Sequence, residues 1–331
     1  MTLQTIGNPA SVKGNFQYHD VIGLLSASAE GFSGPVSVAF GPDGNLYVAS
    51  RGNPNQQEAV RITRCGKDGE YLGQVPGWGE EEGQFIWITD IAFNGDGKLF
   101  AAEEHTQRIN VYDPSDFSFL YSFGQQGDGE GQWNRPSGIA FDSSDNLFVV
   151  DSLNHRIQQY DARGKFRAQW GEFGDAAGQF NMPWDIFIDR DDNIYVSDWR
   201  NDRIQKLTRD GKVLMVFGGS GDGENQFNRP TGVATDADGD IYVCDWMNDR
   251  VQVFDANANY KDTLIGHCGV SKWARSYLDA NPEIEGKLEL AKQNIEPKRR
   301  FYRPASVKVD TDGKVYVADC YRHRVQIYQK L

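Results

Sequence analysis

The sequence predicts an all-β protein, a six-bladed β-propeller of four-stranded antiparallel blades. Three observations predict it: a repeated unit, a second repeat anchor, and an N-terminal segment that completes the last unit. The unit is clearest from Phe227 to Gly266, where a Pro opens a short apolar strand and the turn DADGD follows. The alternating strands IYVCD and RVQVF and a fourth strand, YKDTLIG, complete it. One unit is too small to bury a core, so several must stack together.

The first position of the unit recurs along the chain, and the steps from 136 to 183 and from 183 to 230 are both 47 residues. Such regular phase indicates repeats. The six opening positions are Pro35, Ile88, Pro136, Pro183, Pro230 and Pro304.

The second anchor is an acidic residue that ends the second strand, with an Arg beginning the third strand five positions later. The pairs are Glu103 with Arg108, Asp151 with Arg156, Asp198 with Arg203, Asp245 with Arg250, and Asp319 with Arg324. The first unit departs from this pattern, because it has Ser50 and then Arg61, with the insertion GNPNQQ between them.

The sixth unit ends after its third strand, RVQIY, where the chain stops at Leu331. The segment FQYHDVIGLLS, residues 16–26, precedes the first unit and can supply the missing outer strand. This closure leaves no open gap between the first and last blades. We therefore expect residues 1–331 to form a single domain, with residues 1–15 as a polar lead-in.

The units PSGIAFDSSDNLFVVDSLNHRIQQYD and PTGVATDADGDIYVCDWMNDRVQVFD resemble NHL repeats. The resemblance covers nearly the whole chain and implies a six-bladed propeller. It is weak for function, because the family includes ubiquitin-ligase scaffolds, RNA binders, extracellular sensor domains and a few lyases.

Residues 267–300 fall outside the repeat pattern and lengthen the step before the last unit. Trp273, Tyr277 and Leu278 have helical spacing, and EGKLELAKQNI after Pro282 predicts a second short helix. The insertion replaces a loop on the face that usually carries the site, which we call the top face. It is either a helical lid over the central pocket or an embellishment that only packs against the blades.

The chain has a formal net charge of -13, which argues against nucleic acid as a partner. No segment approaches membrane-spanning length, and the N-terminus lacks the basic start and apolar run of a signal peptide. We expect a soluble, cytoplasmic protein that has no membrane partner. Cys65, Cys244, Cys268 and Cys320 have no metal-ligand spacing, as expected for thiols in a reducing compartment.

The residue two places after each opening position is expected to face the central channel. These residues are Ser37, Asp90, Gly138, Asp185, Gly232 and Ser306. Two carboxylates in a narrow channel need water, an Arg or a cation beside them. If Asp90 and Asp185 converge, they suit a divalent cation (Ca²⁺ or Mg²⁺) or general acid/base catalysis. Otherwise they are solvated or accept hydrogen bonds from backbone amides.

Beside Asp90 in the repeat alignment, Glu103 and Glu104 stand where blades three to six have a single Asp followed by Ser, Trp or Cys, and His105 comes next in the same loop. Glu103 is expected to pair with Arg108, which leaves Glu104 and His105 free to assist catalysis. A zinc site of His105, His155 and His323 is not favoured, because the last two directly precede the repeat Arg, where NHL units commonly have His for structural reasons. The acidic turns are explained by hairpin chemistry, and the glycine stretches lack a nucleotide-binding pattern.

Aromatic and cationic residues of the top-face loops differ from blade to blade. We predict that they form a ligand site, with the insertion contributing one Trp. The predicted ligand-binding residues are Trp184, Trp199, Arg200, Trp246, Tyr302, Tyr321, Arg322 and Trp273. A partly apolar, partly cationic concavity suits an aromatic or amphipathic molecule or a peptide. The alternative is a surface of isolated aromatic side chains.

The leading functional hypothesis is non-catalytic binding of a peptide, protein or small molecule on the top face, and no cofactor is firmly implied. The main alternative is a metal-assisted lyase or hydrolase in which Asp90 and Asp185 act as ligands or acid/base. A third hypothesis is a scaffold subunit within a larger assembly.

Overall fold

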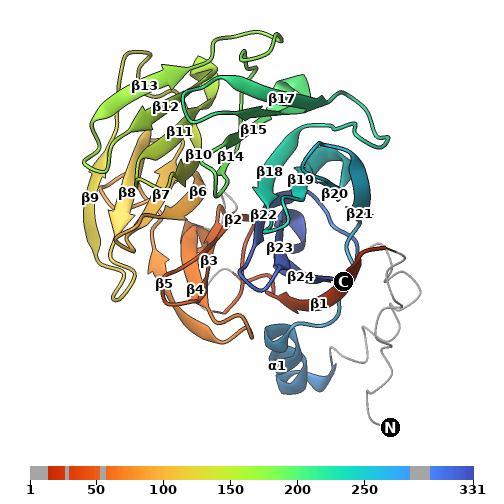
Figure 1. Ribbon diagram of the computed structural model, residues 1–331. Helices are drawn as coiled ribbons and strands as arrows, with labels where there is room; N and C mark the ends of the chain where they lie inside the picture. The colour runs from red at the N-terminus through yellow and green to blue at the C-terminus, as the bar shows by residue number, and fades with distance from the viewer. Residues whose placement is uncertain (1–13, 27–29, 53–56, 284–298) are drawn as a thin grey trace.

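The computed structural model describes residues 14–26, 30–52, 57–283 and 299–331. Six four-stranded antiparallel sheets are arranged around a central axis, so the predicted six-bladed β-propeller is confirmed (Figure 1). In each blade the strand entering from the preceding blade is innermost. Among the described residues, no helix is long and apolar enough to cross a membrane.

The first three blades follow the chain order from the axis outward. The first blade contains β2 (Pro35–Phe40), β3 (Leu46–Ser50), β4 (Arg61–Cys65) and β5 (Tyr71–Pro76). The second contains β6 (Ile88–Phe93), β7 (Leu99–Glu103), β8 (Arg108–Tyr112) and β9 (Phe119–Phe123). The third contains β10 (Pro136–Phe141), β11 (Leu147–Asp151), β12 (Arg156–Tyr160) and β13 (Phe166–Trp170).

The fourth and fifth blades repeat this order, and the sixth takes its outer strand from the N-terminus. The fourth contains β14 (Ile186–Ile188), β15 (Ile194–Asp198), β16 (Arg203–Leu207) and β17 (Val213–Gly218). The fifth contains β18 (Pro230–Thr235), β19 (Ile241–Asp245), β20 (Arg250–Phe254) and β21 (Tyr260–Leu264). The sixth contains β22 (Pro304–Val309), β23 (Lys314–Asp319), β24 (Arg324–Lys330) and β1 (Phe16–Ile22).

The ring closes as predicted, because β1 pairs antiparallel with β24 from Phe16–Lys330 to Ile22–Val325. At this closure Lys330 Nζ lies 2.8 Å from Asp236 Oδ2 and 2.7 Å from Asp238 Oδ2, in the first hairpin of the neighbouring fifth blade. The closing blade is therefore joined to its neighbour by ion pairs as well as by its own ladder.

The core is divided into clusters between adjacent blades. One aromatic side chain three residues before each opening position lies in each cluster, which confirms the predicted packing role of this repeat position. They are Phe32, Phe85, Trp133, Phe180, Phe227 and Phe301, and none is more than 2% exposed. Burial of such side chains contributes roughly 2 to 3 kcal/mol each.

Each repeat Asp at the end of a second strand is structural. In the fourth blade Asp198 is fully buried, and its Oδ2 accepts from Arg203 Nε at 2.7 Å and from Asn201 Nδ2 at 2.8 Å. Its Oδ1 accepts from the Asn181 backbone N–H at 2.7 Å, which fixes the loop entering the blade. Neutralisation and several donors offset the cost of burying the carboxylate.

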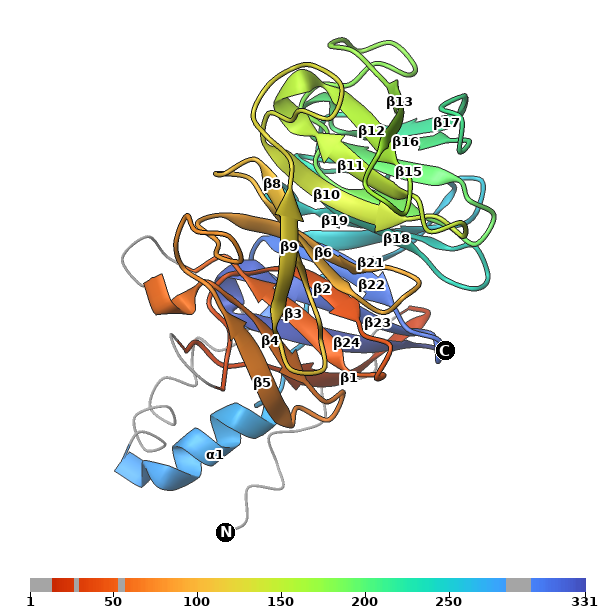
Figure 2. The ribbon, with the colours of Figure 1, turned by 90° about the vertical axis from the view of Figure 1, so that its left-hand side faces the viewer.

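The insertion begins as a helix at the edge of the ring. Helix α1 (Lys272–Ala280) is capped at its N-terminus by Ser271, whose Oγ accepts from the Ala274 N–H at 3.1 Å and donates to Gly23 O at 2.5 Å. Figures 1 and 2 show α1 at the periphery, beside β1 and β5, rather than over the central axis. The predicted second helix lies outside the described residues, so the interpretation of the insertion as a lid stays a prediction.

Candidate functional site

At the centre of the top face a small cavity leads into the channel. Its volume is about 10 Å³, close to the space needed by one water molecule. The lining residues are Val36, Thr89, Asp90, Gly138, Trp184, Asp185, Ala305 and Ser306. Two predicted catalytic residues and one predicted ligand-binding residue therefore meet here.

Asp90 uses its carboxylate to connect three inner strands. Its Oδ1 accepts from Ser37 Oγ of β2 at 2.5 Å and from its own neighbour, the Ile91 N–H, at 2.9 Å. Its Oδ2 accepts from the Ile139 N–H of β10 at 2.8 Å. The side chain is only 4% exposed. These donors match one alternative from the sequence, in which the channel acids bind backbone amides.

Asp185 makes the same kind of connection between the fourth and fifth blades. Its Oδ2 accepts from the Val233 N–H of β18 at 3.1 Å. Burial raises the pKa of Asp185, Lys308 opposes this effect, and the nearby charge of Asp90 raises the pKa further. Burial also raises the pKa of Asp90, again opposed by Lys308. Lys308, on β22, is thus the cation whose charge lowers the pKa of both channel acids and partly offsets their burial.

A glycine follows each acid one blade further round the ring. A Cβ on Gly138 would lie 2.8 Å from the Asp185 Cα, and one on Gly232 would lie 2.7 Å from the Ser306 Cα. Any side chain here would collide with backbone. The glycines therefore let the inner strand of the third blade lie close to that of the fourth, and β18 lie close to β22.

The channel acids do not gather further metal-ligating side chains. Among the described residues, no group of three or more His, Cys, Asp or Glu side chains is placed to hold a metal ion. Glu104 and His105 are not among the residues that line the cavity. The arrangement of Asp90 and Asp185 fits strand connection with a lysine counter-ion better than a Ca²⁺ or Mg²⁺ cage.

Glu103 and Arg108 are cross-strand partners, but no ion pair joins their side chains in the described part of the chain, so that expectation is wrong. Glu103 Oε1 accepts from the Trp87 N–H at 2.7 Å and from the His105 N–H at 3.2 Å, because the longer side chain curls back over its own loop. Arg108 Nη2 instead donates to the Glu80 carbonyl at 2.7 Å.

Glu104 links two arginines across three blades. It is 5% exposed, and its carboxylate lies 3.1 Å from Arg51 Nη2 and 3.5 Å from Arg135 Nη1. Both guanidinium groups also lie near the Trp87 ring, at 5.6 Å and 5.9 Å from its centroid. His105 contacts the other side of this group, with its ring 5.3 Å from Trp87. Glu104 therefore holds the guanidinium groups of Arg51 and Arg135 beside the Trp87 ring.

A second cation–aromatic group surrounds Trp199, which begins the 3₁₀ turn η3 (Trp199–Asn201). Arg229 lies 4.7 Å and Arg200 5.6 Å from the Trp199 ring centroid. Trp184 packs beside it at 6.3 Å. In the described part of the chain, no carboxylate forms an ion pair with either guanidinium. The two guanidinium groups beside the Trp199 ring therefore carry positive charge that no described carboxylate neutralises.

The third group surrounds Trp246, in the turn η4 (Trp246–Asn248). Arg303 lies 5.0 Å from the Trp246 ring and 5.6 Å from the Tyr302 ring. Tyr302 and Tyr321 are 40% and 51% exposed, and their rings are 5.3 Å apart. Arg322 lies 5.4 Å from Tyr302. Tyr321 and Arg322 belong to the turn η6 (Cys320–Arg322).

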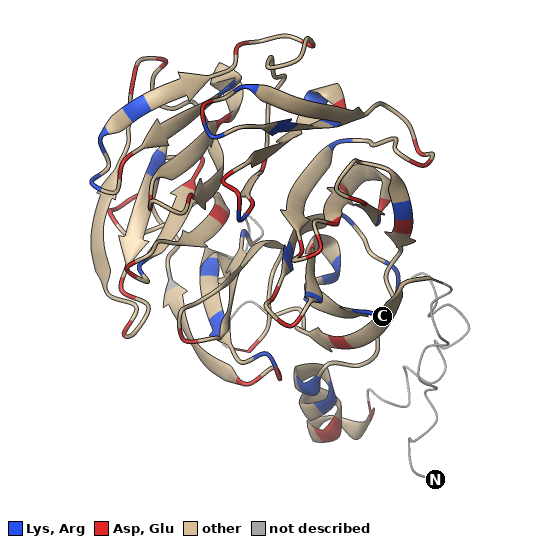
Figure 3. Cartoon of the chain, viewed as in Figure 1, with Lys and Arg blue, Asp and Glu red and all other residues tan. Residues whose placement is uncertain are grey.

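These three groups together form what we call the Arg–Trp rim. The rim consists of Arg51, Trp87, Glu104, Arg135, Trp184, Trp199, Arg200, Arg229, Trp246, Arg303, Tyr302, Tyr321 and Arg322. All come from loops of the top face, on a chain whose net charge is -13. Figure 3 shows acidic positions recurring in turns and loops around the ring, with Lys and Arg positions also on several blades.

Most predicted ligand-binding residues belong to the rim, with one correction. Trp273 is 4% exposed and packs against Phe32 with ring centroids 5.3 Å apart. It is a core residue, because α1 uses its apolar face to cover the outer edge of the ring.

Sequence reasoning missed four rim arginines and Lys308. Arg135, Arg229 and Arg303 each precede an opening position, where the other blades have Gly34, Trp87 and Met182. All three arginines have positive φ, which is uncommon for bulky residues. Comparing this repeat position between blades would have found them. Lys308 stands out similarly, where four blades have Ala.

The left-handed residues are held by acceptors from the preceding blade. The Arg229 N–H donates to Asp202 Oδ1 at 2.8 Å, and the Arg303 N–H donates to Asp249 Oδ1 at 2.9 Å. His155 Nδ1 and His323 Nδ1 accept equivalent bonds at 3.0 Å from the N–H groups of Met182 and Gly34. The two histidines are blade connectors.

The comparisons with known proteins agree with the fold. The NHL repeat model matches residues 134–160, 180–207, 227–254 and 301–328. The chain is thus a six-bladed β-propeller that carries NHL repeats, and the resemblance noted in its sequence is confirmed. A search of curated proteins finds no match.

Three solved structures are similar at low identity. A protein of unknown function from Bacteroides thetaiotaomicron is 20% identical, with a TM-score of 0.63 over 96% of this chain and 72% of its own. A streptogramin B lyase is 14% identical, with a TM-score of 0.57 over 95% and 98%. A catalytically inactive virginiamycin B lyase from Staphylococcus aureus, with quinupristin, is 13% identical, with a TM-score of 0.56 over 96% and 100%. These identities show a shared fold alone.

Proposed function

We propose that this protein is a binding module whose Arg–Trp rim docks a segment of a partner protein rich in acidic and aromatic side chains. The observation that carries the proposal is the group around Trp199, where two guanidinium groups lie on one indole and no described carboxylate pairs with them. Carboxylates of a ligand would form ion pairs with these arginines, and its aromatic rings would pack on the exposed tyrosines.

The shape of the top face favours an extended partner over a small molecule. Small-molecule pockets usually enclose about 300 to 1,000 Å³, whereas the cavity at the channel mouth holds about 10 Å³. Trp, Tyr and Arg are the residue types that dominate protein interfaces. A rim spread over several blades suits a peptide segment that crosses the face.

The catalytic alternative has less support. Asp185 has a raised pKa and lines the channel mouth, as a general acid would. The cavity beside it has no room for a substrate, and the carboxylate already accepts from the Val233 N–H. We therefore favour binding over a lyase or hydrolase activity.

The test uses immobilised copolymers as probes in biolayer interferometry. Poly(Glu,Tyr) should bind, poly(Glu) should bind more weakly, and poly(Lys,Tyr) should not bind. Binding should weaken as salt is added, because the arginines supply much of the attraction. A single-stranded RNA oligomer serves as the competing polyanion.

Two variants make the test specific. Trp199→Ala should weaken poly(Glu,Tyr) binding by about 30-fold, the effect of losing an interface hot spot of about 2 kcal/mol. Tyr277→Ala is the matched control, since this 49% exposed aromatic lies on α1 and outside the rim. Absence of copolymer binding, preference for RNA, or an equal loss in both variants would contradict the proposal.

A further inference from the structure

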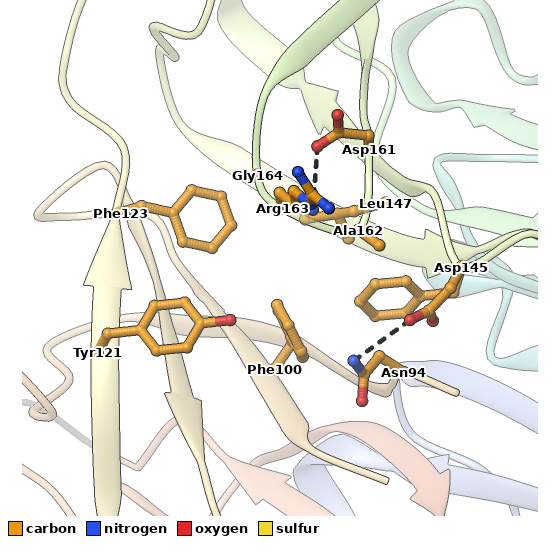
Figure 4. Close-up of a pocket in the computed structure, with 11 residues that line it drawn as sticks. Asn94, Phe100, Tyr121, Phe123, Asp145, Leu147, Asp161, Ala162, Arg163 and Gly164 are labelled. Carbon is orange, nitrogen blue, oxygen red and sulfur yellow. Dashed lines mark hydrogen bonds between the residues drawn. The ribbon is translucent and has the colours of Figure 1, made fainter. Parts of the chain in front are cut away.

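A cavity of about 230 Å³ lies between the second and third blades, on the face opposite the Arg–Trp rim. Figure 4 shows side chains from both blades around it, with the Tyr121 hydroxyl directed into the space. Its deepest walls are Phe100 and Leu147, which are 6% and 3% exposed. The hairpin at residues 161–164 and the side chain of Asp145 form part of its edge.

The equivalent space between the third and fourth blades is filled by the protein itself. Trp170 of β13 stacks on Phe148 with ring centroids 5.9 Å apart and an interplanar angle of 13°. The indole also lies against the next hairpin, because a Cβ on Gly211 would come 1.8 Å from Trp170 Cδ1. An indole is thus held between an aromatic ring and a glycine turn.

Phe100 and Gly164 at the cavity correspond to Phe148 and Gly211 at the next junction, whereas Phe141 and Tyr121 correspond to the smaller Ile188 and Ala168. Phe123 takes the place of Trp170, since each pairs with the equivalent Ile of its third strand, Ile109 or Ile157. Phe123 packs with its ring 5.8 Å from Trp133. The glycine that corresponds to Gly211 is Gly164, and a Cβ there would meet nothing within 4 Å. The open space therefore lies where the neighbouring junction places its indole.

The walls offer aromatic contacts and an acceptor. Phe100 and Phe141 meet edge to face with centroids 4.9 Å apart. Asp145 Oδ1 accepts from the Gly95 N–H at 2.6 Å, whereas Oδ2 has only a 3.4 Å contact with Asn94 Nδ2. Oδ2 can therefore accept from a ligand N–H. Apolar cavities of about 150 Å³ already bind benzene, so 230 Å³ accommodates a larger planar ring.

We infer that this cavity is a binding site for an indole group, which occupies the position that Trp170 fills at the next junction. The ring packs among Phe100, Phe123 and Phe141, and its N–H is directed to the polar edge at Asp145. The indole is either a free metabolite or a Trp side chain of another protein. This site is independent of the Arg–Trp rim.

The probe is 5-fluoroindole, followed by ¹⁹F NMR line broadening on the whole chain. N-acetyltryptophanamide, with the same ring on a peptide-like group, distinguishes the two sources. Tighter binding of free fluoroindole assigns a small molecule, and tighter binding of the amide assigns a protein side chain. Saturable binding of at least one probe at millimolar concentration is expected, and failure of both to bind would overturn the inference.

Two variants test where the indole binds, because each places the residue of one junction at the equivalent position of the other. Phe123→Trp places the neighbouring junction's own indole in the cavity and should reduce probe binding at least tenfold. Trp170→Phe should create a second site and raise the stoichiometry in calorimetry from one to two. Circular dichroism checks that each variant folds. If Phe123→Trp folds and still binds normally, or if folded Trp170→Phe gains no site, the assignment is wrong.

Discussion

The channel and the Arg–Trp rim both concentrate charged side chains, but they satisfy them differently. In the channel, Asp90 accepts from Ser37 and from the Ile91 and Ile139 amides, so its carboxylate is saturated by the propeller itself. At the rim, Arg200 and Arg229 lie on Trp199 without an ion-pair partner among the described residues. Charge that the fold has already matched serves structure, and charge that it leaves unmatched on the surface is available for recognition.

The largest effect is expected in the channel. Asp90→Ala removes the acceptor of Ser37 Oγ and of the Ile139 N–H and leaves the Ile91 N–H only a 3.3 Å bond to Ser37 Oγ, so the free energy of unfolding should fall by about 3 kcal/mol. Urea denaturation followed by far-ultraviolet circular dichroism measures this. A loss below about 1 kcal/mol would show that the carboxylate does not hold the inner strands together.

The glycines of the channel provide the next test. Gly232→Ala places a Cβ 2.7 Å from the Ser306 Cα, so the strands must separate. Overpacking of this kind costs about 1 to 3 kcal/mol. Gly219→Ala is the matched control, because a Cβ there meets nothing within 4 Å. Equal unfolding midpoints of the two variants would contradict the close approach of β18 and β22.

His155 and His323, which connect adjacent blades, should make the free energy of unfolding depend on pH. Burial lowers the pKa of His155 and His323 below the ordinary value of 6.5, and each Nδ1 must stay unprotonated to accept its bond. Their contribution is therefore complete above pH 6.5 and is lost as pH falls below it. The expected loss is about 1 kcal/mol per histidine.

A variant without the titrating groups tests this dependence. Gln107 already performs the same connection in the second blade, where its Oε1 accepts from the Arg135 N–H at 2.5 Å. The double variant His155→Gln/His323→Gln should therefore keep the bonds and flatten the stability profile between pH 7 and 5, about the range over which an ordinary histidine titrates. An unchanged slope would assign the pH dependence to other groups.

The fold could be predicted from the sequence because each blade repeats the same local chemistry. The Pro openings, the Asp–Arg pairs and the buried aromatic residues recur, and the closing strand follows from the missing outer strand of the last blade. The repeat alignment also brought Asp90 and Asp185 to one place in the channel. It could not show that their partners are backbone amides, because amides carry no sequence signal.

The rim was only partly predictable. Trp199, Trp246, Tyr302 and Tyr321 were identified as irregular aromatics, but their cations depend on which loops become neighbours when the ring closes. Trp273 was misassigned, because helical spacing does not tell whether a helix covers the centre of a propeller or its edge. Its contact with Phe32 decides this.

The most direct measurement compares one residue from each region in both assays. The free energy of unfolding and the affinity for poly(Glu,Tyr) are measured for Trp199→Ala and Asp185→Ala. We predict that Trp199→Ala loses about 30-fold in affinity with a stability change below about 1 kcal/mol. We predict that Asp185→Ala loses about 2 kcal/mol of stability and, while folded, keeps its affinity. If Trp199→Ala keeps its affinity while folded Asp185→Ala loses its own, the assignment of structure to the channel and recognition to the rim is wrong.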